Sequence, residues 1–344
     1  STQHQGLATR QRFIVHPILL ISTKLLPGTA SSIMQSLNGD LTSCAKPVRF
    51  RAFLCLATVC NLMLLPLCSH AWGPTGHAYV GEAALDRLDS TAREQVEQIL
   101  SPGSAEQSSD ALIRACFWPD EIRKTAGWEW SGPLHYVNIP RNSERYDRQR
   151  DCGDGICVTE GIRKYAQQLT VHGLSGRQRW EALAWLCHLV ADLHQPLHAG
   201  FRDDRGGNRV DIRFQGETVN LHRFWDGELV RSESAKVRSW SAPGANDRPP
   251  DGVALWNPAS VDLWTEESHR IAADLAYPPG KVIDADFARQ SLGIVREQWE
   301  KAASRLALIL NAVLGEGQIE IGDLSSEVPG DAKSDPGATK IRCG

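Results

Sequence analysis

Histidine and aspartate recur at metal-ligand spacing along residues 72–226 of this 344-residue chain. His188 and Asp192 stand four residues apart, as do His222 and Asp226, so on a helix each pair would project from one face. Neutral imidazole together with carboxylate suits zinc. A single pair of this kind is more often a surface ion pair. However, five of the eight histidines after residue 71 have a carboxylate or another histidine at compatible spacing: His77, His135, His188, His198 and His222.

Residues 46–71 have the pattern of a secretory signal peptide. Basic residues at 46, 49 and 51 precede an apolar run over 52–67, and small residues occupy positions 69 and 71. An apolar run of about 16 residues is short of the roughly 20 that cross a bilayer, which argues against a membrane anchor. We therefore expect cleavage before Trp72 and a secreted or periplasmic protein. The free α-amine and the carbonyl oxygen of Trp72 could then bind one metal ion as a bidentate ligand.

The expected segments of the chain and the net charge after the signal peptide narrow the class of protein. Residues 72–315 form the expected domain, 1–45 are an unassigned upstream extension, and 316–344 are an expected disordered tail. After residue 71, 31 Lys and Arg stand against 40 Asp and Glu, a net charge of −9. This balance argues against a duplex-DNA binder with a basic face, but not against an enzyme that meets phosphates through bound cations. No Asn-x-Ser/Thr sequence follows residue 71, which favours a bacterial source.

Four cysteines inside the expected domain have two different settings. Cys152 and Cys157 flank a Gly-Asp-Gly-Ile turn and suit a short-loop disulfide in an oxidising compartment. Zinc thiolates are the alternative, but the spacing matches no Cys-x-x-Cys pair. Cys116 and Cys187 lie in apolar helical runs, where they are either buried thiols or each other's partner.

Hydrophobic periodicity predicts a single all-α domain with a small β-hairpin. Alternation at Val210, Ile212 and Phe214 predicts a strand, and a turn at Gln215 and Gly216 returns it over 218–220. Apolar residues elsewhere repeat at helical spacing. The expected helices cover residues 75–88, 91–100, 110–125, 159–171, 175–194, 221–230, 261–275 and 284–314.

Six motifs, taken in order, resemble the trinuclear-zinc single-strand nucleases of the S1/P1 family. They are Trp72-Gly-x-x-Gly-His77, Trp118-x-Asp120-x-x-Arg123, Leu134-His135-Tyr136, His188-x-x-x-Asp192-x-x-Gln195-Pro-Leu-His198, Gly206-Gly-Asn208 and Asn220-Leu-His222-x-x-Trp-Asp226. The resemblance runs from Trp72 to about Leu314, and it implies one all-α domain.

The resemblance also implies three zinc ions and their ligands. Asp120, His135, His188 and Asp192 would hold one zinc; Trp72, His77 and the bridging Asp192 a second; His198, His222 and Asp226 the third. It further implies that Asp120 orients the attacking hydroxide and that Arg123 binds the phosphate. Tyr136 would stack on a nucleobase. Asn138 would orient Arg123 from a position where fungal members carry an aspartate.

The activity implied by the resemblance is zinc-dependent endonucleolytic hydrolysis of single-stranded DNA and RNA to 5′-phosphorylated products, with 3′-nucleotides as further substrates. We expect a monomer without stable membrane association. The zinc-dependent phospholipases C share this fold and most ligands, but they typically have glutamate where Asp226 stands. A zinc-binding protein without catalysis is a third reading. A protein of that kind would fill every coordination position of its zinc ions with side chains. The ligands predicted here are too few for that and leave positions for water and substrate.

Overall fold

The computed structural model describes residues 72–100, 108–234, 236, 240 and 256–315. The expected upstream extension, signal peptide and tail lie outside these residues. The chain divides into two compact units, Ser1–Pro66 and Leu67–Gly344, and every described residue belongs to the second. Within the described residues, the prediction of an all-α fold with one small hairpin is confirmed.

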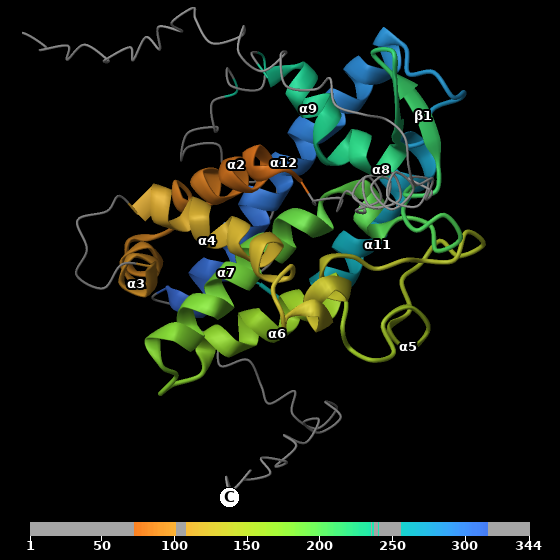
Figure 1. Cartoon of the computed structure of the whole chain (residues 1–344). Helices are drawn as coiled ribbons and strands as arrows, with labels where there is room; N and C mark the ends of the chain where they lie inside the picture. The colour runs from red at the N-terminus through yellow and green to blue at the C-terminus, as the bar shows by residue number, and fades with distance from the viewer. Residues whose placement is uncertain (1–71, 101–107, 235, 237–239, 241–255, 316–344) are drawn as a thin grey trace, which may run out of the picture. The chain divides into compact units, whose positions relative to one another are not determined.

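A buried helix, α7 (Gly176–Leu193), is the centre of the fold (Figure 1). Ser175 begins it with a capping box, in which its hydroxyl accepts from the Gln178 backbone N–H and the Gln178 side chain accepts in return. All residues from 182 to 193 are buried, as expected of a helix that is apolar around its whole circumference. Helices α4 (Ser108–Ile122) and α6 (Val158–Thr170) contact it along its length.

The remaining long helices surround this centre. They are α2 (Pro74–Leu85), α3 (Ser90–Leu100), α11 (Ser260–Leu275) and α12 (Ala285–Leu314). The Asp284 side chain caps α12 by accepting from the Phe287 N–H, and α12 contacts both α2 and α7. The start of the domain is fixed to α12 by an edge-to-face contact between Trp72 and Trp299, whose centroids are 5.7 Å apart.

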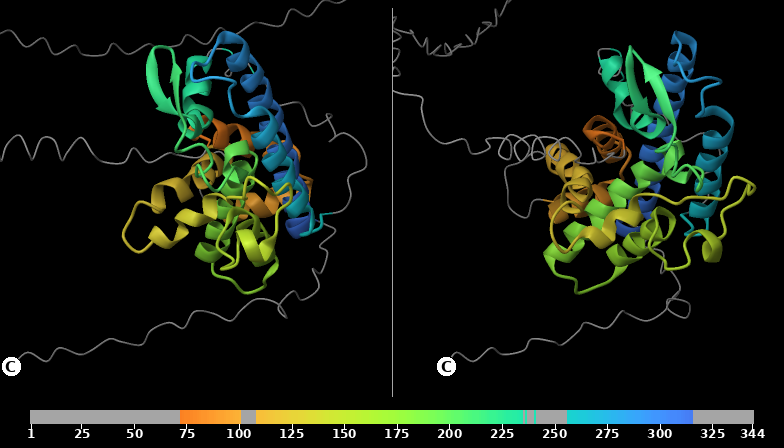
Figure 2. Two further views of the ribbon diagram at one scale, coloured as in Figure 1. Left: turned by 90° about the vertical axis from the view of Figure 1, so that its right-hand side faces the viewer. Right: turned by 45° about the vertical axis from the view of Figure 1, so that its right-hand side comes forward.

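The predicted hairpin consists of β1 (Asp211–Phe214) and β2 (Glu217–Asn220), paired antiparallel with Ile212 opposite Val219. Gln215 and Gly216 both have positive φ, of 50° and 88°, as a two-residue hairpin turn requires. The hairpin lies at the end of the helical body near the beginning of α12 (Figure 2), where Arg213 also forms a bridge with Val282.

The short helices were not predicted correctly. The 3-10 helices η1 (Glu129–His135) and η2 (Pro196–Ala199) and the single turn α5 (Arg148–Asp151) had no expected counterpart. The predicted helix over 221–230 is divided into α8 (Leu221–Arg223), the π-helix η3 (Phe224–Glu228) and α9 (Leu229–Ser232). In η3 the Leu229 N–H donates to the Phe224 carbonyl five residues earlier, which widens the turn.

Two disulfides connect these elements. Cys152 and Cys157 form the predicted short-loop bridge, and Cys116 pairs with Cys187 to join α4 to α7. Cys116 and Cys187 are therefore each other's partner and not two buried thiols. No helix in the described part of the chain combines the length and apolar character needed to span a bilayer.

Candidate metal centre

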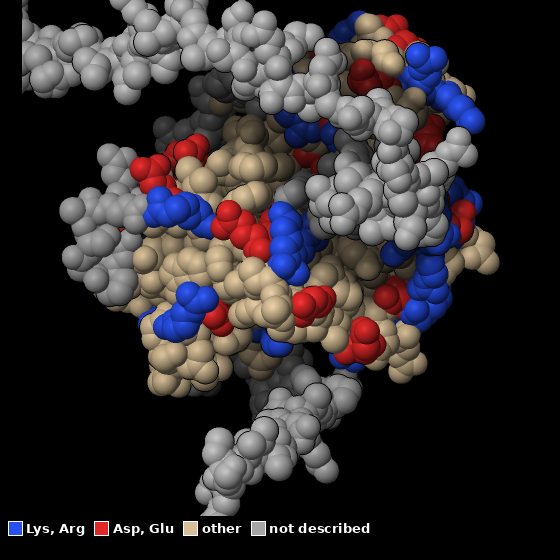
Figure 3. Space-filling view, viewed as in Figure 1, with Lys and Arg blue, Asp and Glu red and all other residues tan. Residues whose placement is uncertain are grey.

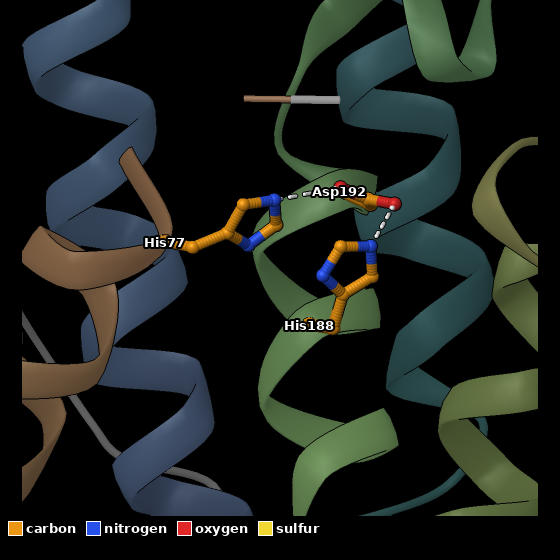
Figure 4. A group of neighbouring side chains, drawn as sticks. All are labelled: His77, His188 and Asp192. Carbon is orange, nitrogen blue, oxygen red and sulfur yellow. Dashed lines mark ion pairs between the residues drawn. The ribbon is translucent and has the colours of Figure 1, made fainter. Parts of the chain in front are cut away.

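Helix α7 presents two of the predicted ligands, His188 and Asp192, to a third from α2. Figure 4 shows the rings of His77 and His188 directed at the Asp192 carboxylate from two sides. His77 Nε2 is 3.4 Å from Asp192 Oδ1, and His188 Nε2 is 3.1 Å from Asp192 Oδ2. The two carboxylate oxygens therefore face different histidines, an arrangement suited to a carboxylate that bridges two cations.

Asp120 and His135 complete a second group around His188. Asp120 comes from the last turns of α4, and His135 is the last residue of η1. His135 Nδ1 is 2.8 Å from His188 Nε2, 2.9 Å from Asp192 Oδ2 and 3.8 Å from Asp120 Oδ1. All four side chains are buried. In the described part of the chain, three sets of buried His and Asp side chains have ligand atoms within 4.8 Å of one another. Two of these sets share His188 and form this one cluster.

The third set consists of His198, His222 and Asp226, carried by η2, α8 and η3. Asp226 Oδ1 is 3.7 Å from His198 Nε2, and Asp226 Oδ2 is 3.5 Å from His222 Nε2. The two imidazole rings are stacked, with centroids 5.1 Å apart. Asp226 lies in the π-turn, an irregularity that often occurs at functional sites.

Backbone carbonyls hold three of the rings in one orientation. The Nδ1 atoms of His188, His198 and His222 lie 2.8, 2.7 and 2.6 Å from the carbonyl oxygens of Cys116, His135 and Gly206. A carbonyl can only accept, so each Nδ1 carries the proton and each Nε2 has a free lone pair directed at the carboxylates. Metal-binding histidines in proteins are commonly oriented in this way.

Gly206 explains part of the Gly-Gly-Asn motif. Its φ is 60°, and a Cβ there would collide with the Leu197 carbonyl oxygen and approach His222 Nδ1. Because only glycine fits this position without strain, the Gly206 carbonyl can reach the His222 ring.

Unsatisfied polar atoms in the cluster fit a bound cation. Within the described part of the chain, both ring nitrogens of His77, Nε2 of His135, Oδ1 of Asp192 and Nε2 of His198 are buried and have no hydrogen-bond partner. Such atoms destabilise a fold unless something binds them. Imidazole nitrogens and carboxylate oxygens in groups of three are suitable zinc ligands, so the residues present fit the metal that the sequence predicts.

Burial and neighbouring charges shift the pKa values of the cluster in different directions. Burial, together with the neighbouring His188, lowers the pKa of His77 to about 3, and burial lowers the pKa of His135 to about 4. Burial alone would raise the pKa of Asp192, but His188 and His198 outweigh it and hold this pKa well below its usual range. His77 and His135 therefore stay neutral beside an ionised Asp192 carboxylate. Burial alone would lower the pKa of His188 and of His198, but the Asp192 carboxylate outweighs it and raises both.

Trp72 is buried at the start of the described chain, next to the third group. The N–H of the following residue, Gly73, donates to the Asp226 carbonyl at 2.8 Å. This contact brings the beginning of the domain to η3. The role of the Trp72 amine and carbonyl as ligands stays a prediction.

Of the predicted phosphate and base contacts, Arg123 meets a ligand of the metal centre, and Tyr136 and Asn138 line a separate cavity. Arg123 Nη2 is 2.9 Å from Asp120 Oδ1. Tyr136, 38% exposed, and Asn138 line a cavity of about 310 Å³, together with Arg202. Arg202 belongs to no recognised motif and so gave no sequence signal. The expected support of Arg123 by Asn138 stays a prediction.

Gln195 has a role that sequence reasoning missed, although it lies inside a recognised motif. Its Nε2 donates to Asp226 Oδ1 at 2.6 Å, and its Oε1 accepts from the Leu197 N–H at 2.6 Å. It thereby joins η2 to η3. His194, by contrast, lies outside all three groups: its Nδ1 donates to the Val190 carbonyl, and its Nε2 accepts from Arg305.

Comparison with known proteins agrees with this geometry. A family model described as S1/P1 nuclease matches residues 72–315. Endonuclease 2 of Arabidopsis thaliana is 31% identical over 272 residues, covering 72% of this chain and 91% of the relative. Endonuclease 4 of the same plant is 32% identical over 270 residues, covering 70% and 89%. Nuclease S1 of Aspergillus oryzae is 25% identical over 274 residues, covering 72% and 93%. The chain therefore belongs to the S1/P1 nuclease family.

Proposed function

We propose that this hydrolase of phosphodiester bonds is a zinc-dependent endonuclease that cleaves single-stranded DNA and RNA to 5′-phosphorylated products and also accepts 3′-nucleotides. The main support for the proposal is the presence of three sets of buried His and Asp side chains in the described residues. Within each set the ligand atoms lie close together, and the sets draw on residues from His77 to Asp226, 149 positions apart. Family membership supports the same activity.

We assign the ligands of three zinc ions as follows. Asp120, His135, His188 and Asp192 bind the first; Trp72, His77 and Asp192 the second; His198, His222 and Asp226 the third. When bound, zinc supplies a water of lowered pKa and neutralises charge on the phosphodiester. Asp192 contributes by directing one oxygen to each of the first two positions.

The chain's other residues bind and orient the substrate. The Arg123 guanidinium presents a planar set of donors beside Asp120, and this geometry matches two oxygens of a phosphodiester. The ion pair with Asp120 orients the guanidinium, and Asp120 in turn positions the attacking water. The exposed ring of Tyr136 stacks on a base, a contact that tolerates any sequence.

Charge on the protein surface is consistent with attraction of the substrate at the metal centre rather than by a broad basic field. Figure 3 shows Lys and Arg side chains interspersed with Asp and Glu over the visible described surface. A nuclease of this composition depends on local cations for its phosphate contacts.

Processing and location follow from the role of Trp72. We propose a secreted or periplasmic protein, cleaved before Trp72, with residues 72–315 forming the monomeric nuclease domain. The new α-amine would join His77 and Asp192 at the second zinc.

The runner-up, a zinc-dependent phospholipase C, is not favoured, because every relative reported above is a nuclease. The test compares hydrolysis of single-stranded DNA, RNA and phosphatidylcholine by protein beginning at Trp72, with and without a chelator. Chelator-sensitive release of 5′-nucleotides is expected. Turnover of lipid alone would move the chain to the phospholipase branch, and zinc content without either activity would leave a binding protein.

A further inference from the structure

Two exposed aromatic side chains lie in and directly after the 3-10 helix that carries His135. Among the large hydrophobic side chains exposed in the described part of the chain, Trp130 and Tyr136 are the aromatic ones, with exposed fractions of 46% and 38%. Trp130 lies in η1, which ends at His135, and Tyr136 follows directly. At a rise of about 2.0 Å per residue, the six steps from Trp130 to Tyr136 span roughly 12 Å.

Trp130 is supported from behind by a continuous aromatic stack. Its ring is stacked on Trp128, with centroids 5.9 Å apart, and Trp128 is stacked on Trp185 at 6.5 Å. Trp185 in turn contacts the His135 ring at 5.8 Å. An isolated exposed tryptophan needs no explanation. This one is held in a fixed orientation by half-buried Trp128 and, behind it, buried Trp185, which contacts the ligand His135, so its exposed face is preorganised.

A cation lies close to this ring. Lys164 Nζ is 6.0 Å from the centroid of the Trp130 ring and 5.5 Å from that of Tyr165, and within the described residues Lys164 makes no ion pair. The nearby carboxylate of Glu129 accepts from the Gly127 N–H and is directed into its own loop. An aromatic face beside an unpaired ammonium is complementary to a base and its adjoining phosphate.

We infer that Trp130 and Lys164 form a second base-stacking subsite for single-stranded polynucleotide, separate from the base position at Tyr136. The inference rests on the proposed function, since it assigns one more nucleotide of the same substrate. The strand would run along η1, with one base on Tyr136 beside the metal centre and another on Trp130. The subsite favours polynucleotides over the shortest substrates, because a dinucleotide at the metal centre ends before it reaches Trp130.

The test compares Trp130→Ala and Trp130→Phe with wild type on two substrates, single-stranded (dT)12 and the dinucleotide dTpdT. We expect Trp130→Ala to raise KM for (dT)12 about tenfold, the effect of losing one stacked base, and to leave KM for dTpdT within twofold. Zinc content and kcat should not change. Trp130→Phe, which keeps an aromatic ring, should have a KM for (dT)12 close to that of the wild type. Leu263→Ala, which truncates a side chain that is 66% exposed on α11, is the control and should have no effect.

Lys164→Gln gives an independent test. Removal of one phosphate contact should lower the dependence of log Kd on log salt by about 0.7 for (dT)12. Equal KM for (dT)12 in wild type and Trp130→Ala, or an equal rise in KM for both substrates, would overturn the subsite.

Failure of the proposed function has a different signature from failure of the subsite. A wild-type protein that hydrolyses neither substrate, yet binds phosphorothioate (dT)12 in fluorescence anisotropy with a Kd that Trp130→Ala raises about tenfold, would remove the nuclease assignment and keep the subsite. An active nuclease whose Kd for the same oligonucleotide is insensitive to Trp130→Ala would remove the subsite alone.

Discussion

Replacing Gln195 with alanine would break the connection between the two segments that carry the third metal group. The Gln195 side chain is buried and uses both ends of its amide, one on Asp226 and one on the Leu197 backbone. A hydrogen bond to a charged group contributes about 1.5–3 kcal/mol, and leaving a buried N–H without a partner costs about 1–3 kcal/mol. Water entering the space left by the side chain would replace part of the two lost hydrogen bonds. We therefore expect the free energy of unfolding of the zinc-free protein to fall by about 3 kcal/mol.

The same substitution should weaken one zinc site more than the others. Without Gln195, Asp226 can rotate away from His198 and His222, and loss of a partner of this kind typically weakens metal binding about 10–100-fold. Zinc retained after dialysis should fall from three to two per chain, and hydrolysis of single-stranded DNA should recover when zinc is raised. The control is Gln298→Leu, because Gln298 is equally buried but its amide has no hydrogen-bond partner among the described residues. Unchanged zinc affinity in Gln195→Ala would refute the argument.

Three further outcomes are expected. Extra residues before Trp72 should lower both zinc content and turnover relative to protein beginning at Trp72, whereas equal values would remove the amine as a ligand. His222→Ala should abolish most turnover, while His194→Ala should keep most of it with a lower Tm, as steady-state rates and thermal unfolding would show. Burial raises the pKa of Glu267, but two neighbouring cations, Arg305 first, lower it to about 2. The stabilisation by Glu267 is therefore complete above its ordinary pKa of about 4.5 and is lost as the pH falls toward 2. The difference in unfolding free energy between the zinc-free wild type and Glu267→Gln should shrink over that range, and a constant difference would contradict the sign.

The sequence predicted the long helices because their apolar periodicity directly reflects burial. The predicted helix over 175–194 became α7 within one residue at each end, since its apolar run and its capping box both mark it. The 3-10 helix η1 could not be predicted, because seven residues containing Pro133 show no 3.6-residue period. The π-turn in η3 was hidden for another reason. It carries the buried Trp225, whose Nε1 donates to the distant Ala276 carbonyl, and no local sequence pattern indicates such a contact.

The candidate ligands could be identified from motifs, but not the contacts that orient them. Local spacing indicated that His188 and Asp192 share a helix face. No spacing indicated that His135, 57 residues before Asp192, would approach its carboxylate within 2.9 Å. The carbonyl partners of the rings and the two bonds of Gln195 likewise depend on the meeting of distant segments. Trp130 was missed because an exposed aromatic has no periodic signature.

The most direct test of the central claim is to titrate zinc into metal-free protein that begins at Trp72, measuring bound zinc and hydrolysis of single-stranded DNA in the same samples. We expect no hydrolysis without zinc, and a rate that rises to a plateau as the third zinc binds to each chain. Hydrolysis that persists without zinc, or full activity before the His198, His222 and Asp226 group is occupied, would contradict it.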